Sequence, residues 1–456
     1  MIHSDKDPIV AIATAAGRGG IGIVRVSFRK TLDREMQTVI FDSNTTLLPR
    51  YAHLLPFKDS VGRILDRAIV LFFPAPHSYT GESVIEIQAH GGPVLMNMIL
   101  QEILKKAKNL GIRLAEPGEF TKRAYLNNQM DLAQAEAVAD LIDAVSESAV
   151  QAAGRSLQGE FSKVVNEIAH EVNELRAFVE ATLDFPEEEI DHLQSAQILS
   201  RIARVKVSLT DVIQNARQGS VLREGVTVAI VGSPNVGKSS LLNALARQEV
   251  AIVTDIPGTT RDKIEHWVNI NGIPVKMVDT AGIRETSDIV ESKGIERTLA
   301  EVRKADVVLH LTDASGCIAD DEKVLEKVLA EVRRGVPLVN VCNKTDLCTG
   351  KKAGEEFFIS ARTGEGLQSL KDHLIQIVGM ASSTDGLFMA RERHLACLRS
   401  ALEHISIATE IGSDISMLEL LAEELRLSGR YLGDILGETT SDDILGIIFG
   451  KFCIGK

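Results

Sequence analysis

One stretch, GSPNVGKS at residues 232–239, limits what this chain can fold into. It follows the strand-like run VTVAIV and precedes the helix-like run SLLNALAR, which is the strand–loop–helix setting of a phosphate-binding loop. Backbone N–H groups from about Asn235 to Ser240 would converge there on a β-phosphate at the N-terminus of a helix. The stretch therefore predicts a nucleotide-binding domain built on a mostly parallel sheet.

Within this loop the residue types have separate tasks. Gly232 and Gly237 let the backbone wrap closely around the phosphates. Lys238 supplies positive charge to the β- and γ-oxygens, and the hydroxyl of Ser239 is a Mg²⁺ ligand. The predicted nucleotide contacts from the loop are Asn235, Val236, Gly237, Lys238, Ser239 and Ser240.

Later motifs, in the expected order, indicate GTP rather than ATP. In NKTD (343–346), Asp346 can accept from both N1–H and the exocyclic amine of guanine, a pattern that adenine lacks. Asn343 and Lys344 would support the base, and SAR (360–362) would cap it through its backbone. Thr260 is the expected second hydroxyl ligand of Mg²⁺. These motifs predict further GTP contacts at Pro257, Gly258, Thr259, Thr260, Asp279, Thr280, Ala281, Gly282, Asn343, Lys344, Thr345, Asp346, Ser360, Ala361 and Arg362.

The residue after DTAG (279–282) is Ile283, where many small GTPases have a glutamine that orients the attacking water. Glu291 is a candidate replacement, although on spacing alone a surface glutamate at a helix start is favoured. Arg261 and Arg284 are available as cationic groups. Asn235 could instead help to hold a monovalent cation, which does the same electrostatic work as an arginine finger.

The pattern of strand-like and helix-like runs changes along the chain, and these changes predict several domains. Strand-like runs in 1–118 indicate an α+β domain, whose helix PVLMNMILQEILKKAKNLG should end at Gly111. Residues 119–215 and 381–456 have helical periodicity, and 216–380 alternates strands with helices. Since neither helical stretch closes a core alone, they should pack together. The predicted fold class is a multidomain α/β chain: an α+β N-terminal domain, a discontinuous all-α domain, and an inserted Ras-like P-loop domain.

The overall composition limits which binding partners and which cellular compartment are expected. The formal net charge is −13, so any contact with nucleic acid must be local rather than a broad basic coat. Five cysteines follow no pairing or CxxC pattern, which is typical of a reducing compartment. No apolar run reaches the roughly 18–20 residues that span a bilayer. We expect a cytoplasmic protein without a membrane segment.

Several segments outside the P-loop domain carry a family resemblance. GRGGIGIVRVS, TGESVIEIQAHGGP, PGEFTKRAYLNNQMDLAQAEAVADLID, DFPEEEI and the terminal FCIGK resemble the MnmE (TrmE) family of tRNA modification GTPases, from about residue 8 to 456. The resemblance implies a folate-binding, dimerising N-terminal domain at 1–118. It also implies a helical domain in two parts, 119–215 and 381–456, with the G domain at 216–380.

That family's activity is implied in the same way. With a flavin-dependent partner, MnmG (GidA), the family adds an aminomethyl or carboxymethylaminomethyl group to carbon 5 of the wobble uridine (U34) of certain tRNAs. A reduced folate, 5-formyl- or 5,10-methylene-tetrahydrofolate, would donate the one-carbon unit. The resemblance further implies that K⁺-dependent pairing of G domains across a homodimer activates GTP hydrolysis.

Residue by residue, the resemblance assigns the hydrolytic site. Asn235, Thr254, Ile256 and Thr259 match the K⁺ site, with Asp255 in the same nucleotide-binding loop. Ser239 and Thr260 match the Mg²⁺ ligands. Glu291 matches the water-activating glutamate, which reverses the interpretation from spacing alone. Lys238 is expected to be catalytic from its place in the phosphate loop.

A second site follows from the resemblance in the N-terminal domain and the terminal CIGK. Arg25, Glu86 and Lys456 match folate-contacting positions, and Gln129 stands where the family often has Lys. From the residues alone, Arg25 would be a surface salt bridge and Glu86 would face solvent. Cys453 is a catalytic candidate, as a nucleophile or attachment point; the alternative is a half-buried apolar cysteine.

Three functions compete at this stage. The first is a tRNA-modifying GTPase that acts with a partner on a folate donor. The second is a ribosome-assembly or regulatory GTPase without group transfer, which an appended KH-like or basic RNA module would favour; the sequence has none. The third is a stand-alone folate aminomethyltransferase with a regulatory G domain.

Overall fold

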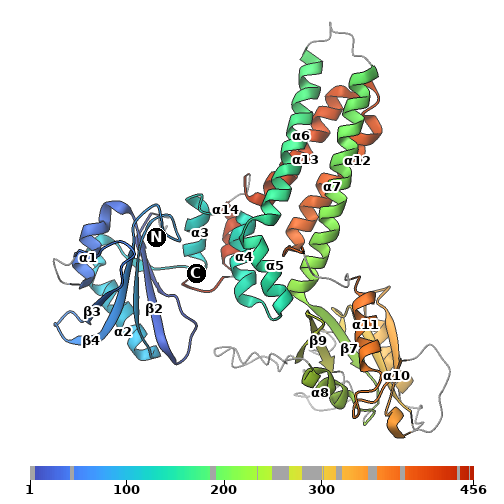
Figure 1. Cartoon of the computed structure of the whole chain (residues 1–456), viewed down its shortest axis with the longest axis horizontal. Helices are drawn as coiled ribbons and strands as arrows, with labels where there is room; N and C mark the ends of the chain where they lie inside the picture. The colour runs from blue at the N-terminus through green and yellow to red at the C-terminus, as the bar shows by residue number, and fades with distance from the viewer. Residues whose placement is uncertain are drawn as a thin grey trace.

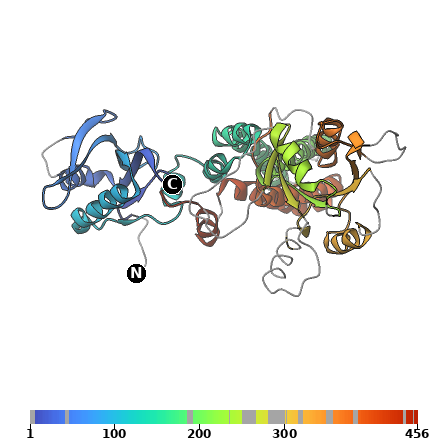
Figure 2. The ribbon, with the colours of Figure 1, turned by 90° about the horizontal axis from the view of Figure 1, so that it is seen from below.

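The structure is a computed structural model that describes residues 6–41, 46–184, 192–233, 235–248, 266–279, 300, 302–314, 321–347, 357–379, 386–438, 442–450 and 452–455. Figure 1 shows three bodies: a sheet domain at the N-terminus, a long helical bundle, and an α/β domain at one end of the bundle. The sheet domain and the α/β domain lie apart in both views (Figures 1 and 2). The C-terminal end of the chain returns to the N-terminal domain.

The N-terminal domain is a six-stranded sheet with strand order β3-β4-β5-β2-β1-β6. Its neighbours pair antiparallel except β1 with β6. One face is covered by α1 (Asp33–Phe41) and α2 (Pro93–Lys106), whose apolar side chains share a core with the strands. The helix predicted to end at Gly111 ends earlier, at Lys106, and a short 3-10 turn at Lys108–Leu110 follows it. Gly111, in the left-handed region with φ +77°, ends that turn. The strands are β1 (Ile9–Ile12), β2 (Gly19–Phe28), β3 (His53–Lys58), β4 (Ile64–Phe73), β5 (Ser83–Gly91) and β6 (Arg113–Leu114).

Helices from both ends of the chain form one bundle, as expected from their periodicity. α6 packs along α13, and α7 packs along α12. Their apolar side chains form a shared core that includes Val172, Ile202, Leu398 and Leu425, which explains why neither stretch could close a core alone. Among the described residues, no helix is long and apolar enough to cross a membrane. The helices are α3 (Glu119–Leu126), α4 (Leu132–Asp143), α5 (Glu147–Leu157), α6 (Glu160–Asp184), α7 (His192–Glu224), α12 (Glu392–Ile411), α13 (Leu418–Leu436) and α14 (Asp442–Phe449).

The α/β domain is inserted between α7 and α12. Its six strands have the order β12-β11-β10-β7-β9-β8, and every pair is parallel except β8 with β9. α7 extends past residue 215, and Gly225 at φ +71° turns the chain from it directly into β7. The predicted fold class is confirmed. The elements are β7 (Val226–Val231), α8 (Lys238–Gln248), β8 (His266–Ile270), β9 (Ile273–Asp279), β10 (Val307–Asp313), α10 (Asp321–Glu331), β11 (Leu338–Asn343), β12 (Phe357–Phe358) and α11 (Leu367–Ile377).

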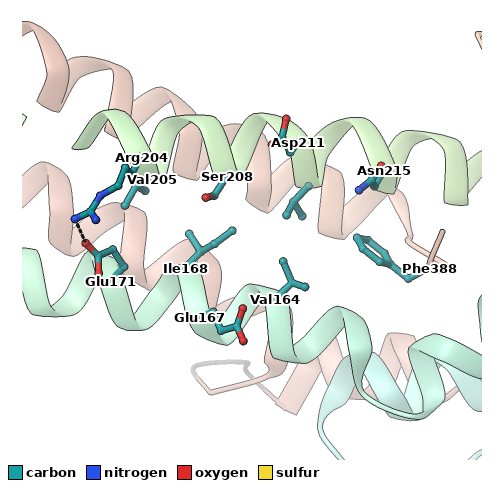
Figure 3. A pocket seen from close by; sticks show the side chains of 11 residues that line it. Val164, Glu167, Ile168, Glu171, Arg204, Val205, Ser208, Asp211, Asn215 and Phe388 are labelled. Atoms are coloured by element: carbon teal, nitrogen blue, oxygen red, sulfur yellow. Dashed lines mark hydrogen bonds and ion pairs between the residues drawn. The ribbon is translucent and has the colours of Figure 1, made fainter. Parts of the chain in front are cut away.

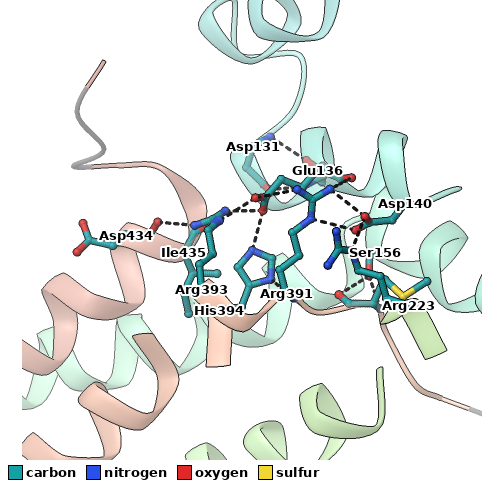
Figure 4. Close-up of polar contacts among 12 residues, drawn as sticks. Asp131, Glu136, Asp140, Ser156, Arg223, Arg391, Arg393, His394, Asp434 and Ile435 are labelled. Atoms are coloured by element: carbon teal, nitrogen blue, oxygen red, sulfur yellow. Dashed lines mark hydrogen bonds and ion pairs between the residues drawn. The ribbon is translucent and has the colours of Figure 1, made fainter. Parts of the chain in front are cut away.

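A buried ion cluster lies where the chain returns from the α/β domain to the bundle (Figure 4). Glu136 on α4 accepts from Arg393 Nη2 at 2.6 Å and from His394 Nε2 at 2.8 Å. Only 1% of the Glu136 side chain and 2% of the His394 side chain are exposed. Because the Nδ1 atom of His394 accepts the backbone N–H of Arg391 at 3.1 Å, the imidazole is neutral with its proton on Nε2.

The same cluster also holds the point where the chain leaves the bundle. Asp140, one turn beyond Glu136, accepts from Arg391 Nη2 at 2.8 Å and from Arg223 Nε at 2.8 Å. Arg223 lies in the last turn of α7, just before β7, and Arg391 immediately precedes α12. Two carboxylates on α4 therefore fix both connections of the inserted domain.

The pKa shifts of Glu136 and His394 both make the cluster less stable in acid. Burial alone would raise the pKa of Glu136, but His394 and Arg393 hold it below its ordinary value. Burial lowers the pKa of His394. A depressed carboxyl pKa gives stability above the unfolded-state pKa that is lost as pH falls, and a depressed histidine pKa likewise costs stability as pH falls below about 6.5. Acid should therefore weaken this junction.

We expect Glu136→Gln to destabilise the bundle by about 3–5 kcal/mol, because it leaves buried cationic groups without their counter-charge. Urea unfolding followed by circular dichroism measures this change. The variant should also lose part of the acid dependence of stability. The exposed Glu403→Gln on α12 is the control and should change stability by less than about 0.5 kcal/mol. A Glu136→Gln loss no larger than the control's would contradict the role of the cluster.

Candidate functional site

The predicted phosphate loop has the expected geometry where it is described. Asn235 and Gly237 have positive φ angles of +65° and +101°. Lys238 is the first residue of α8 and is only 6% exposed, and its Nζ donates to the carbonyls of Gly232 at 2.6 Å and Ser233 at 2.9 Å. Ser239 and Ser240 are exposed at the same helix start. Together these features form a loop at a helix N-terminus that suits a phosphate group.

One asparagine joins the phosphate loop to the base-recognition segments. Asn343 ends β11 and is 2% exposed. Its Nδ2 donates to the carbonyl of Val236 at 2.8 Å, and its Oδ1 accepts the N–H of Ala361 at 3.0 Å. A Cβ at Gly237 would collide with this side-chain amide, so glycine is needed there for the close approach. NKTD, SAR and the phosphate loop are thus held in one place.

Asp346 is poised to accept from a base edge. It is exposed, and its Oδ1 accepts the hydroxyl of Ser360 at 2.7 Å, where Ser360 itself is fully buried. Its other oxygen is available to a ligand. Lys344, at φ +66°, pairs with Asp313 at 2.6 Å. The four predicted residues 343–346 lie with 360–362 at the carboxyl end of β11.

The structure describes only some of the other residues that are predicted to take part in GTP hydrolysis. Asp279 ends β9, whose backbone pairs with β7. The predicted residues at 254–260 and 280–282, and Glu291, lie outside the described residues. The described part of the chain also has no cluster of three or more His, Cys, Asp or Glu side chains that would hold a metal ion. Of the two predicted Mg²⁺ ligands, Ser239 lies in the described part of the chain and Thr260 does not.

A second cluster forms where the C-terminal tail meets the N-terminal domain. Ile454 bridges to Pro117, and Gly118 N–H donates to the carbonyl of Cys453 at 3.3 Å. Glycine is required at Gly118, which has φ +65° and would carry a Cβ only 2.6 Å from the carbonyl of Phe449. The tail is thereby brought against the start of α3.

Arg25 lies at the centre of this cluster. It stands directly opposite Glu86 in the β2–β5 pairing, and its Nε donates to Glu86 at 2.9 Å. Its Nη1 donates to the carbonyl of Gly455 at 3.5 Å. The guanidinium also lies 5.5 Å from the ring centroid of Tyr79 and 5.7 Å from that of Phe120, distances at which cation–π attraction acts.

The structure shows the surroundings of these predicted residues, and Arg25 forms the salt bridge that its sequence position suggested. Glu86 pairs with Arg25 instead of facing open solvent, and the pair is mostly buried, with 16% and 21% of the side chains exposed. Cys453 is exposed rather than half-buried. Gln129 is exposed. Its side chain lies beside Gly81, a residue of the turn that follows Tyr79. Lys456 lies outside the described residues.

Some residues of both clusters were not foreseen. Tyr79 and Phe120 flank Arg25, and burial raises the pKa of the Tyr79 hydroxyl. Asp313 holds Lys344 from the neighbouring strand. Their roles depend on pairing between segments that are far apart in the chain, and no local motif marks them.

Comparison with known families agrees with this geometry. A model described as "MnmE helical domain" matches residues 132–453, and one described as "GTP-binding protein TrmE N-terminus" matches 8–129. The chain is 52% identical to a protein named tRNA modification GTPase MnmE from Burkholderia cenocepacia (strain HI2424), over all of both chains. The chain belongs to the MnmE family of tRNA modification GTPases. The correspondingly named protein of Paraburkholderia xenovorans (strain LB400) is 51% identical, again over all of both chains.

A solved structure also matches part of the chain. A single-residue variant of Era from Aquifex aeolicus, bound to GDP·AlF4⁻, is 29% identical over 39% of this chain and 66% of that chain, with a TM-score of 0.28. That TM-score supports no further conclusion. Membership of the MnmE family, together with the joined phosphate and base segments, makes the chain a GTP-hydrolysing enzyme.

Replacing Asp346 with Asn should weaken GTP binding by about 100-fold, because two charge-assisted bonds to guanine are lost. Titration with a fluorescent GTP analogue measures the effect. Xanthosine triphosphate should bind the variant better than GTP, since its carbonyl can accept from the new amide.

The exposed Asp372→Asn on α11 is the matched control and should bind GTP normally. A GTP affinity of Asp346→Asn equal to that of the control would argue against base recognition by Asp346.

Proposed function

We propose that this chain couples GTP hydrolysis to modification of carbon 5 of the wobble uridine (U34) in certain tRNAs. The group added is aminomethyl or carboxymethylaminomethyl, with a reduced folate, 5-formyl- or 5,10-methylene-tetrahydrofolate, as one-carbon donor. The chain acts as a homodimer in the cytoplasm with a flavin-dependent partner of the MnmG kind. In this proposal, residues 1–118 bind folate and form the dimer, and residues 216–380 hydrolyse GTP. Residues 119–215 and 381–456 form the helical domain.

The observation that carries the GTPase half is the link made by Asn343. Its amide contacts the phosphate loop at Val236 and the SAR segment at Ala361, so a triphosphate and a guanine base are bound at a fixed separation. Asp346 would select the base, and Lys238 would supply positive charge to the β- and γ-oxygens. This arrangement supports specific binding of GTP.

The hydrolytic step is assigned to residues of this chain. Ser239 and Thr260 would hold Mg²⁺, and Asn235, Thr254, Ile256 and Thr259 would hold K⁺. Bound, these cations would supply positive charge next to the oxygens on which negative charge develops. Glu291 would orient the attacking water. In many small GTPases a glutamine at the position of Ile283 does this.

The second half is supported by the meeting of tail and sheet at Arg25. A guanidinium suits the carboxylates of a folate tail, and the half-buried ring of Tyr79 lies beside it. Glu86, Gln129 and Lys456 complete the proposed folate contacts. The exposed thiol of Cys453 lies in the same tail, where it can reach a substrate.

Nucleoside analysis of tRNA from cells that lack this protein tests the proposal. Aminomethyl- and carboxymethylaminomethyl-uridine should disappear from the wobble position and return with the wild-type gene. Arg25→Ala should restore GTP hydrolysis but not the modified nucleosides. Unchanged wobble uridines in the deletion strain would favour a ribosome-assembly or regulatory GTPase.

A second experiment separates the parts of the hydrolytic site. In K⁺, Glu291→Ala should hydrolyse GTP about 100-fold more slowly than wild type with near-normal nucleotide affinity, the size expected for loss of a general base. Exchange of K⁺ for Na⁺ should slow the wild type by at least about tenfold, because a fixed positive charge is lost.

The exposed Glu365→Ala in the same domain is the control for the glutamate and should turn over normally. A Glu291→Ala rate equal to wild type would remove that residue from the step, and a rate indifferent to the cation would remove the K⁺ site.

A further inference from the structure

One side of the helical bundle is left open. α6 packs along α13, α13 along α12, and α12 along α7, whereas α6 and α7 contact each other much less. A groove of about 460 Å³ lies in the resulting gap between α6 and α7. It belongs to neither cluster described above.

The floor of the groove is apolar and firmly packed. It is formed by Val164 and Ile168 from α6, Val205 and Val212 from α7, and Phe388 at one end. Figure 3 shows the side chains of Val164, Ile168 and Phe388 directed into the gap. Apart from Val164 these residues are at most 6% exposed. The floor is thus fixed by the bundle core and does not depend on an occupant for its shape.

Its rim carries an excess of negative charge. Three carboxylates, Glu167, Glu171 and Asp211, line the rim together with Arg204. Glu171 is compensated, because it pairs with Arg201 at 2.9 Å and with Arg204 at 3.5 Å. The excess therefore comes from Glu167 and Asp211. Glu167 has a solvent-exposed contact with Lys163 at 4.0 Å, which is too weak to hold it. Asp211 makes no ion pair with any residue in the described part of the chain.

The groove has the dimensions of a short helix. From Arg204 to Asn215 the α7 wall runs for about 16 Å, or about three helical turns. An occupant of that length could place apolar side chains at i, i+4 and i+7 on the floor and basic side chains against Glu167 and Asp211. This is the helix-in-groove mode of recognition. RNA is disfavoured because its phosphates would meet these carboxylates.

We propose that the groove between α6 and α7 binds an amphipathic helix with basic flanking residues, presented by a protein partner. The inference rests on the proposed function, in which the chain acts together with a second protein. It adds the surface that this partner uses and the chemistry that the surface selects.

The position of Phe388 gives the groove a connection to the G domain. Phe388 lies in the segment 386–391 that leads from the G domain into α12, and its ring stacks on Phe161 with centroids 4.7 Å apart. The flanking residues are pinned to α5, because Leu387 accepts from Arg155 at 2.6 Å and Met389 donates to Ser156 at 2.8 Å. An occupant of the groove therefore touches the segment that follows the G domain.

Two variants test the groove in the full-length protein, with the purified flavoprotein partner as the probe. Ser208→Trp fills the groove from the α7 wall, and Asp211→Arg reverses the charge of the rim. Each should weaken binding of the flavoprotein at least about tenfold in calorimetry. Intrinsic GTP hydrolysis and thermal stability should remain at wild-type values, since neither residue belongs to the nucleotide or folate cluster.

The exposed Glu403→Arg on α12 makes the same charge change away from the groove and should bind the flavoprotein within about twofold of wild type. If wild type binds and both groove variants bind equally well, the inference is wrong. If Asp211→Arg strengthens tRNA binding and leaves flavoprotein binding intact, the surface faces RNA and the inference is likewise wrong. If Ser208→Trp does not fold, Asp211→Arg alone decides.

Failure of the proposed function gives a different result. In that case wild type and Glu403→Arg also fail to bind the flavoprotein, and the partner assignment falls together with this inference. Loss confined to the groove variants supports both.

Discussion

The arrangement of the domains depends on two buried carboxylates of α4. Glu136 and Asp140 bind the arginines that flank both connections of the inserted domain, with hydrogen bonds of 2.6 to 2.8 Å (Figure 4). Burial of an ion cluster costs solvation free energy, and only complete pairing offsets that cost. The cluster consequently favours one arrangement of α4, the end of α7 and the start of α12, which orients the G domain on the bundle.

Close backbone approaches do comparable work at the two functional clusters. Gly237 leaves room for the Asn343 amide, and Gly118 leaves room for the end of α14. In each case a segment far away in sequence is brought against a loop that a side chain would obstruct. The phosphate loop thereby meets the base-recognition segment, and the C-terminal tail meets Arg25. Gly455 in the tail likewise lies against the backbone of Ile12, where a side chain would not fit.

The bundle relates these clusters to each other. Its C-terminal helices carry the chain from the G domain back to the N-terminal sheet, so the tail that touches Arg25 is continuous with the segment containing Phe388 and Arg391. A partner bound between α6 and α7 would contact that segment near its beginning. The G domain, the groove and the Arg25 cluster are thus connected by one stretch of chain that starts at the ionic junction.

The sequence by itself determined the fold class and the phosphate and guanine motifs, because these depend on local spacing: a strand, a glycine loop and a helix must follow one another to form a phosphate site. Periodicity likewise predicted that the two helical stretches share a core. Only the tertiary structure decided that Glu86 pairs with Arg25, that Tyr79 and Phe120 flank it, and that Glu136 holds residues more than two hundred positions away. Such contacts depend on sheet register and helix packing between distant segments, and no local pattern encodes them.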